Sequence, residues 1–168
     1  TMLFKEIIGQ QELKQKLRGL VRDDRTPHAL MLHGPQGTGK LPLAIAMAQY
    51  LACTDRQEMD SCGQCASCVK FEKLVHPDLH FVVPVLKTGN MTAPPVSDDY
   101  AGLWRDALQR EPYLTENRWY ESLGAENKQG IINVKESENI IRKLGFKPYE
   151  SDYRMVIIWL PEKMNQPA

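Results

Sequence analysis

The stretch His33-Gly34-Pro35-Gln36-Gly37-Thr38-Gly39-Lys40 decides the fold of this chain. It follows a short apolar run, residues 28–33, and precedes residues 43–51, which are rich in Ala, Leu, Ile and Met. We expect the run to be a buried strand and the later segment to be a buried helix. A glycine-rich turn in that setting is typical of a phosphate-binding loop, because its backbone N–H groups and the helix N-terminus face an anion. The simpler interpretation is a glycine-rich turn with a surface lysine.

Two positions depart from the pattern of a hydrolytic phosphate loop. Leu41 stands where Ser or Thr normally binds Mg²⁺, and leucine cannot ligate a metal. Residues 155–158 predict a strand that should end in acidic residues, but the chain continues Trp159-Leu160-Pro161. We therefore interpret the site as degenerate: nucleotide binding stays open and hydrolysis is not expected. The alternative is that Glu162, the first acid after the strand, moves into register.

The four cysteines lie close together in the sequence. Eight residues separate Cys53 from Cys62, two separate Cys62 from Cys65, and two separate Cys65 from Cys68. This spacing suits a tetrahedral zinc ion, and four thiolates would leave no open position, which predicts a structural site. Iron–sulfur ligation, a redox dithiol and unliganded thiols or a disulfide are the alternatives. Neither His76 nor His80 is expected to be a ligand.

Further along the chain, helical and strand patterns alternate. We expect helices over residues 10–23, 69–75, 97–110, 115–123 and 135–144, and strands over residues 79–85 and 154–160. This order predicts an α/β fold with a parallel sheet flanked by helices. Three or four strands are few for such a sheet, so we expect residues 1–168 to form an incomplete domain, with a helix starting near its end.

The composition favours a folded protein without a strong charge preference. The chain has 168 residues, 42% of them hydrophobic, with 21 Lys+Arg against 21 Asp+Glu. That balance argues against intrinsic disorder and offers no overall attraction to nucleic acid. We find no apolar run long enough to cross a membrane and no secretory signal, so the expected location is the cytoplasm.

Together these motifs resemble the bacterial clamp-loader subunits of the AAA+ class, the gamma/tau and delta-prime subunits of the DNA polymerase III holoenzyme. The resemblance rests on the phosphate loop followed by C-x8-C-x2-C-x2-C. It is supported by Ile7-Ile8-Gly9-Gln10, by the strand-like run over residues 28–32, by His76-Pro77-Asp78 and by Lys163-Met164-Asn165. It covers nearly the whole chain, except residues 86–130, which we interpret as an insertion.

The resemblance implies an AAA+ P-loop domain with an inserted zinc module over residues 53–68. In that family Ile8 would line the adenine pocket, and residues 34–41 would bind ATP. Leu41 and Trp159 favour the delta-prime type, which does not hydrolyse ATP, so no catalytic residue is assigned. The implied partners are the gamma/tau and delta subunits and, through the complex, the sliding clamp and primed DNA. The implied arginine finger, lid and collar would follow Ala168.

Two other functions remain as alternatives. One is an active clamp-loader ATPase of the gamma/tau type with unusual ligands. The other is a zinc-containing adaptor with no role in replication. The aromatic residues of the insertion (Tyr100, Trp104, Tyr113, Trp119 and Tyr120) form either a small core of their own or a partner surface.

Overall fold

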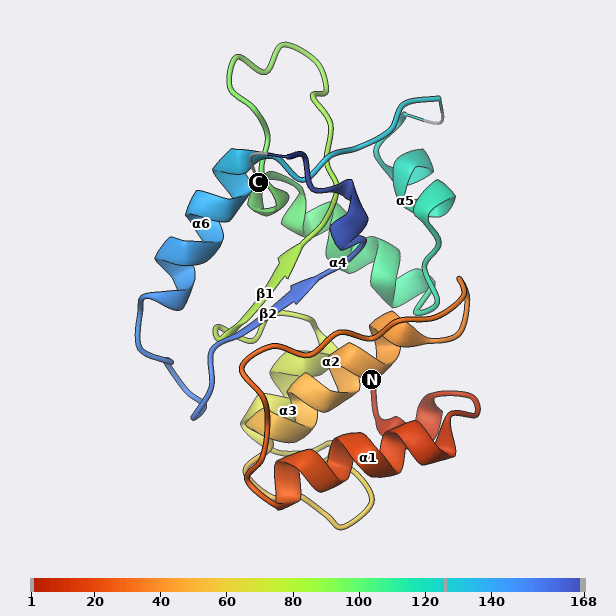
Figure 1. Cartoon of the computed structure of the whole chain (residues 1–168), viewed down its shortest axis with the longest axis vertical. Helices are drawn as coiled ribbons and strands as arrows, with labels where there is room; N and C mark the ends of the chain where they lie inside the picture. The colour runs from red at the N-terminus through yellow and green to blue at the C-terminus, as the bar shows by residue number, and fades with distance from the viewer. Residues whose placement is uncertain (1, 126, 167–168) are drawn as a thin grey trace. The chain divides into compact units, whose positions relative to one another are not determined.

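The computed structural model describes residues 2–125 and 127–166, and the chain divides into two compact units. Unit 1 comprises Thr1–Leu79 and Pro148–Met155, and unit 2 comprises His80–Lys147 and Val156–Ala168. Each unit therefore contains two separate stretches of the sequence. The α/β class expected from the sequence is confirmed, and Figure 1 labels its helices and strands.

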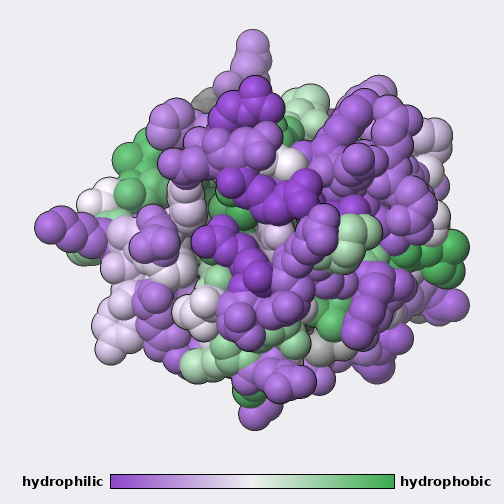
Figure 2. All heavy atoms as spheres, turned by 90° about the horizontal axis from the view of Figure 1, so that it is seen from below, coloured by the Kyte–Doolittle hydropathy of each residue, from purple (hydrophilic) through white to green (hydrophobic). Residues whose placement is uncertain are grey.

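Unit 1 is built from helices around a core of aliphatic and aromatic side chains. Its elements are the 3-10 helix η1 (Phe4–Glu6), α1 (Gln11–Arg22), α2 (Lys40–Ala52) and α3 (Ala66–Glu72). The core is formed by Phe4, Ile7, Leu17, Val21, Leu43, Ala46, Met47 and Tyr50. Leu17 and Val21 lie one turn apart on α1, as the helical spacing of its apolar residues predicts. The outer face of α1 is polar. Figure 2 shows the molecule from below the view of Figure 1, and this surface is mainly hydrophilic with small hydrophobic patches.

Unit 2 holds the remaining helices and both strands except their first residues, Leu79 and Met155, which belong to unit 1. Its elements are β1 (Leu79–Val82), η2 (Ser97–Tyr100), α4 (Ala101–Arg110), α5 (Glu116–Ser122), α6 (Val134–Leu144), β2 (Met155–Ile158) and η3 (Pro161–Lys163). The segment expected to start a helix at the end of the chain forms the short η3, and residues 167–168 lie outside the described residues.

The sheet consists of β1 paired with β2 (Figure 1). The N–H of Met155 donates to Asp78 O, and the N–H of Trp159 donates to Val82 O, at 2.8 Å each. Both partners advance four residues in the same direction, which makes the pair parallel. Short bridges join Val85 to Ile131 and Ile132 to Met164. The sheet is smaller than the three or four strands expected.

The buried strand expected over residues 28–33 is not found. The segment is irregular, and Leu30 and Met31 are exposed. A strand needs backbone partners, and within the part of the chain that the structure describes the sheet consists of β1 and β2 alone. The apolar residues of this segment are compatible with a strand, but no neighbouring strand is present among the described residues to pair with it.

Aromatic rings fill the core of unit 2. The ring of Trp104 lies 5.7 Å from Phe81, 5.1 Å from Trp119 and 5.2 Å from Trp159, measured between centroids. Trp104, Trp119, Tyr100 and Tyr120 are buried and Tyr113 is partly buried, so these residues form a core rather than a free surface. Residues 86–130 lie within unit 2, and their status as an insertion stays a prediction.

Buried polar contacts fix α6 within unit 2. The carboxylate of Glu136 accepts hydrogen bonds from the N–H of Ser97 at 2.6 Å and from its hydroxyl at 2.8 Å. The same hydroxyl also accepts the N–H of Val83 at 2.9 Å.

Among the residues that the structure describes, no helix is long and apolar enough to cross a membrane.

Candidate metal centre and phosphate-binding loop

The expected phosphate loop, residues 34–40, is an irregular turn that leads into the first residue of α2. Gly37 and Gly39 have φ angles of +80° and +82°, in the left-handed region where glycine is favoured. Gly34 has a φ of +153°. The three glycines of the motif therefore allow a backbone path that other residues would adopt only with strain. Pro35, Gln36 and Thr38 complete the turn.

The side chain of Lys40 folds back over this turn. Its ammonium donates to Gly34 O at 2.8 Å and also to Pro35 O. The hydroxyl of Thr38 donates to the same Pro35 O at 2.9 Å. Lys40 thus provides a positive charge held against the loop, at the end of the helix where an anion is favoured.

Leu41, the position of the missing Mg²⁺ ligand, points into the protein. Its side chain is 7% exposed, and Pro42 beside it is also buried in the first turn of α2. Ile8, which the family resemblance assigned to an adenine pocket, is 81% exposed, while Ile7 packs in the core. The described structure therefore brings residues 34–40 together as one loop and leaves Ile8 at the surface.

The end of β2 carries no acidic side chain. Trp159 follows the strand, and its ring packs against Trp104 at an interplanar angle of 48° in the aromatic core of unit 2. Leu160 has a φ of +57°, which turns the chain sharply into η3. Glu162 lies in η3 and is exposed, so it does not occupy the strand position where an acid was considered.

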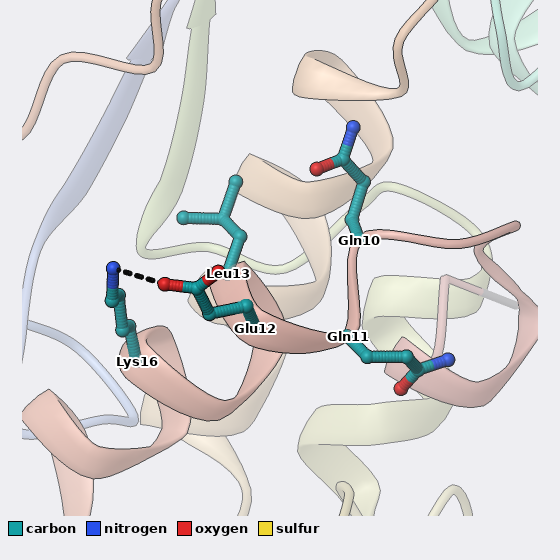
Figure 3. Close-up of a pocket in the computed structure, with 5 residues that line it drawn as sticks. All are labelled: Gln10, Gln11, Glu12, Leu13 and Lys16. Carbon is teal, nitrogen blue, oxygen red and sulfur yellow. Dashed lines mark hydrogen bonds and ion pairs between the residues drawn. The ribbon is translucent and has the colours of Figure 1, made fainter.

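A shallow hollow of about 280 Å³ lies on the first turns of α1, lined by Gln10, Gln11, Glu12, Leu13 and Lys16. Figure 3 shows the ion pair that joins Glu12 to Lys16, 2.7 Å apart, and the side chains of Gln10 and Gln11 pointing in different directions. The amide of Gln10 donates to Thr38 O at 3.3 Å, which connects the start of α1 to the turn over residues 34–40. The hollow contains no buried charged group and was not expected from the sequence.

The four cysteines lie together in unit 1, at the end of α2, in the following loop and on α3. The sulfurs of Cys53 and Cys62 are 3.6 Å apart, those of Cys62 and Cys68 are 3.9 Å apart, and those of Cys65 and Cys53 are 4.0 Å apart. All four sulfurs lie within 4.8 Å of one another. Metal–sulfur bonds of about 2.3 Å in a tetrahedron give sulfur separations of about 3.8 Å. The cluster therefore has the dimensions of a four-thiolate metal site.

Backbone N–H groups point at the sulfurs. Cys53 accepts from the N–H of Cys62 at 3.4 Å, and Cys62 accepts from Gln64 at 3.4 Å and from Cys65 at 3.3 Å. Such contacts stabilise thiolates and orient metal ligands. The turn that supplies them includes Gly63, whose φ of +74° favours glycine.

The thiols of Cys53, Cys65 and Cys68 differ in acidity. Burial raises the pKa of Cys53, and the N–H of Cys62 opposes that rise. Burial also raises the pKa of Cys68, against the effects of the Gln49 side chain and the N–H of Gly63. For Cys65 the effect of burial is outweighed by the N–H groups of Cys68 and Thr54, which help to lower its pKa to about 6. A metal ion that binds all four sulfurs would displace protons from the buried pair.

His76 lies outside the group of four cysteines and makes its own contacts. Its Nδ1 accepts the N–H of Asp78 at 3.2 Å, and its Nε2 lies 3.3 Å from the hydroxyl of Ser67. Burial lowers the pKa of His76, which is consistent with a neutral ring that uses both nitrogens in these contacts. Among the described residues, the candidate metal ligands are the four cysteines. All four are free thiols.

The structural roles of two aspartates in unit 1, Asp60 and Asp78, were not identified from the sequence. Asp60 accepts the N–H groups of Phe4 at 3.0 Å and Lys5 at 2.9 Å, which ties the cysteine loop to η1. Asp78 accepts the N–H groups of Tyr149, Glu150 and Ser151 at 2.6, 2.7 and 2.9 Å. Only the proximity of Asp78 to the His76-Pro77 turn hinted at its role, because its partners are distant in the sequence.

Comparison with known proteins identifies relatives of this chain. Residues 9–168 match the family described as DNA polymerase III, delta subunit. The chain is 35% identical over 75 residues to DNA polymerase III subunit delta' of Bacillus subtilis (strain 168), which is 45% of this chain and 22% of the relative. It is 37% identical over 81 residues to DNA polymerase III subunit delta' of Yersinia pestis, covering 48% of this chain and 21% of the relative.

A plant protein is similar over part of the same length. The chain is 37% identical over 70 residues to Protein STICHEL of Arabidopsis thaliana, which is 42% of this chain and 6% of that protein. In each case the chain spans a small part of the curated relative it matches. The family match, by contrast, extends over almost all of the chain. This chain therefore belongs to the DNA polymerase III delta subunit family.

Proposed function

We propose that this chain is part of a delta-prime-type subunit of a clamp loader, which serves DNA replication through assembly rather than by hydrolysing ATP itself. The observation that carries the proposal is the family match over residues 9–168. The delta-prime assignment is supported by Leu41, which is buried in the core, and by Trp159, which packs on Trp104. The proposed partners are the gamma/tau and delta subunits and, through them, the sliding clamp and primed DNA.

The loop over residues 34–40 would hold the phosphates of ATP in this proposal. Its backbone N–H groups and the Lys40 ammonium supply the attraction for an anion. Bound ATP would favour one arrangement of the subunits in the complex. Because Leu41 offers no oxygen for Mg²⁺, we expect binding that does not depend on the metal and no turnover.

The four cysteines would hold one structural zinc ion. Support comes from the sulfur separations of 3.6–4.0 Å and from the N–H groups directed at Cys53 and Cys62. Thiolates favour zinc over hard cations, and a full set of four protein ligands leaves no place for a reactive water. The zinc would therefore stabilise the loop between α2 and α3 and take no part in chemistry.

The second candidate is an active ATPase of the gamma/tau type. It is supported by Lys40, whose ammonium contacts Gly34 O, and by the positive φ angles of Gly34, Gly37 and Gly39. The two candidates differ in whether Mg²⁺ supports turnover.

Calorimetry and an ATPase assay on the zinc-loaded full chain distinguish the delta-prime-type subunit from the active ATPase. We expect ATP to bind equally with and without Mg²⁺, without phosphate release, and Lys40→Ala to abolish binding while the exposed Lys16→Ala retains it. Mg²⁺-dependent hydrolysis that is lost in Lys40→Ala would instead establish the ATPase. Failure of the protein to co-purify with gamma/tau and delta subunits would contradict a role in the clamp loader.

A further inference from the structure

Gln49 is an unusual residue in the core of unit 1. It lies on α2, and its side chain is fully buried. Neither the amide nitrogen nor the amide oxygen makes a hydrogen bond. A buried polar group without a partner destabilises a fold and calls for an explanation such as an absent ion or ligand.

The position of Gln49 places it beside the cysteine cluster. It comes four residues before Cys53, so the two side chains project from the same face at the end of α2. Cys53 and Cys68 are the two buried cysteines, with exposed fractions of 3% and 1%.

Backbone N–H groups supply some of the donors to the cluster. The turn around Gly63 directs N–H groups at Cys62 and Cys53. Cys68 is the deepest of the four sulfurs, and a thiolate at that depth needs donors more than an exposed one does. The amide of Gln49, which is buried and has no hydrogen-bond partner, can supply one.

We propose that Gln49 is a positioning residue of the metal site, whose amide N–H donates to a buried sulfur of the cluster, that of Cys53 or Cys68, when the four cysteines hold zinc. The inference rests on the proposed zinc site and deepens it by adding a side chain outside the four ligands. Outer contacts of this kind hold a ligand in its orientation, and their loss typically weakens metal binding by about 10- to 100-fold. The other explanation is that Gln49 only fills space in the core.

The test compares Gln49→Met with the wild-type full chain. Methionine has a similar length but no N–H to donate. Zinc affinity is measured by competition with a chromogenic chelator, and cobalt is substituted to record the sulfur-to-cobalt charge-transfer band. We expect zinc affinity to fall about 10- to 100-fold. We also expect the band to move to lower energy, because a thiolate that loses a hydrogen bond gives up its electrons more easily.

Two further variants sharpen the comparison. Gln57→Met makes the same change in the loop between Cys53 and Cys62, where the side chain is exposed, and should bind zinc as the wild type does. Gln49→Glu keeps the shape but places a carboxylate beside the thiolates, and should bind more weakly than Gln49→Met. In the metal-free state Gln49→Met should be at least as stable as the wild type, because it removes an unpaired buried amide.

The outcomes are distinct. The inference is supported if Gln49→Met binds zinc more weakly than the wild type while its metal-free form is at least as stable. Wild-type affinity and an unshifted cobalt band in Gln49→Met would overturn it and leave the zinc site intact. A wild-type chain that binds no zinc would overturn the zinc site and the inference with it.

Discussion

Asp78 is a fully buried carboxylate that anchors a distant stretch of the chain. Its hydrogen-bond donors are backbone N–H groups 71 to 73 residues further along the sequence. Burial by itself would raise the pKa of Asp78, but these N–H groups outweigh it and hold the pKa below its ordinary value. The guanidinium of Arg154, 3.7 Å away, adds a favourable charge.

We expect Asp78→Asn to lower the free energy of unfolding by about 1–3 kcal/mol at pH 7, since a neutral amide is a weaker acceptor for these N–H groups. The pKa of Asp78 is lower in the folded chain than in the unfolded chain. Its stabilisation is therefore present above the unfolded value, about 3.9, and is lost as the pH falls through the folded value.

Urea denaturation between pH 3 and pH 7 measures this effect. The wild type should lose more stability on acidification than Asp78→Asn does. Asp152→Asn, an exposed site in the same segment, should behave as the wild type. Parallel pH profiles for the wild type and Asp78→Asn would contradict the role given to this carboxylate.

At the scale of single elements, two helices of unit 2 begin with different caps. Asn133 precedes α6, where its side chain accepts the N–H of Lys135 at 3.0 Å and donates to Pro95 O at 2.7 Å. Thr115 precedes α5 and accepts the N–H of Arg118 at 3.4 Å. Asn133 is buried and joins its helix to a loop, whereas Thr115 makes only the cap contact.

We expect Asn133→Ala to destabilise the protein by about 2 kcal/mol, near the upper end for helix caps, because it removes a cap and a buried hydrogen bond. Thr115→Ala should cost about 0.5–1 kcal/mol. Chemical denaturation of both variants measures the difference, and equal losses would show that the contact with Pro95 contributes nothing.

The elements also show which parts of the fold the sequence could predict. The helices near α1, α2 and α6 were predicted from local properties: the spacing of apolar residues in α1, and a composition rich in Ala, Leu, Ile and Met in α2. The expected strand over residues 28–33 was wrong, because its apolar pattern does not specify the neighbouring strand with which it would pair. The start of α4 was placed early, since residues 97–100 form the 3-10 helix η2.

At the scale of the whole molecule, metal removal should act on one part of the chain. If zinc holds the four sulfurs, a chelator should release the loop between α2 and α3 while leaving α4 (Ala101–Arg110) as it was. Hydrogen exchange checks this. The N–H groups of Cys62 and Cys65, which bond to sulfur, should lose protection, and those of α4 should keep it. Unchanged exchange at Cys62 would contradict a structural metal.

The difference between local and distant contacts also explains which residues of the candidate site could be predicted from the sequence. The proximity of the four cysteines followed from spacings within sixteen residues, and the structure brings their sulfurs within 4.8 Å. Gln49 carries no motif, and its significance depends on the burial of its amide. Asp60 and Asp78 act on backbone groups 55 or more residues away, which no local pattern reveals.

The anchor at Asp78 also has a consequence for the order in which the protein is made. A ribosome completes residues 1–79 of unit 1 long before it reaches residues 148–155, which finish the unit. At about 5–20 residues per second, the intervening stretch takes several seconds to emerge. During that delay the Asp78 carboxylate has no N–H partners from residues 149–151, so unit 1 should acquire its final stability only after most of unit 2 has been synthesised.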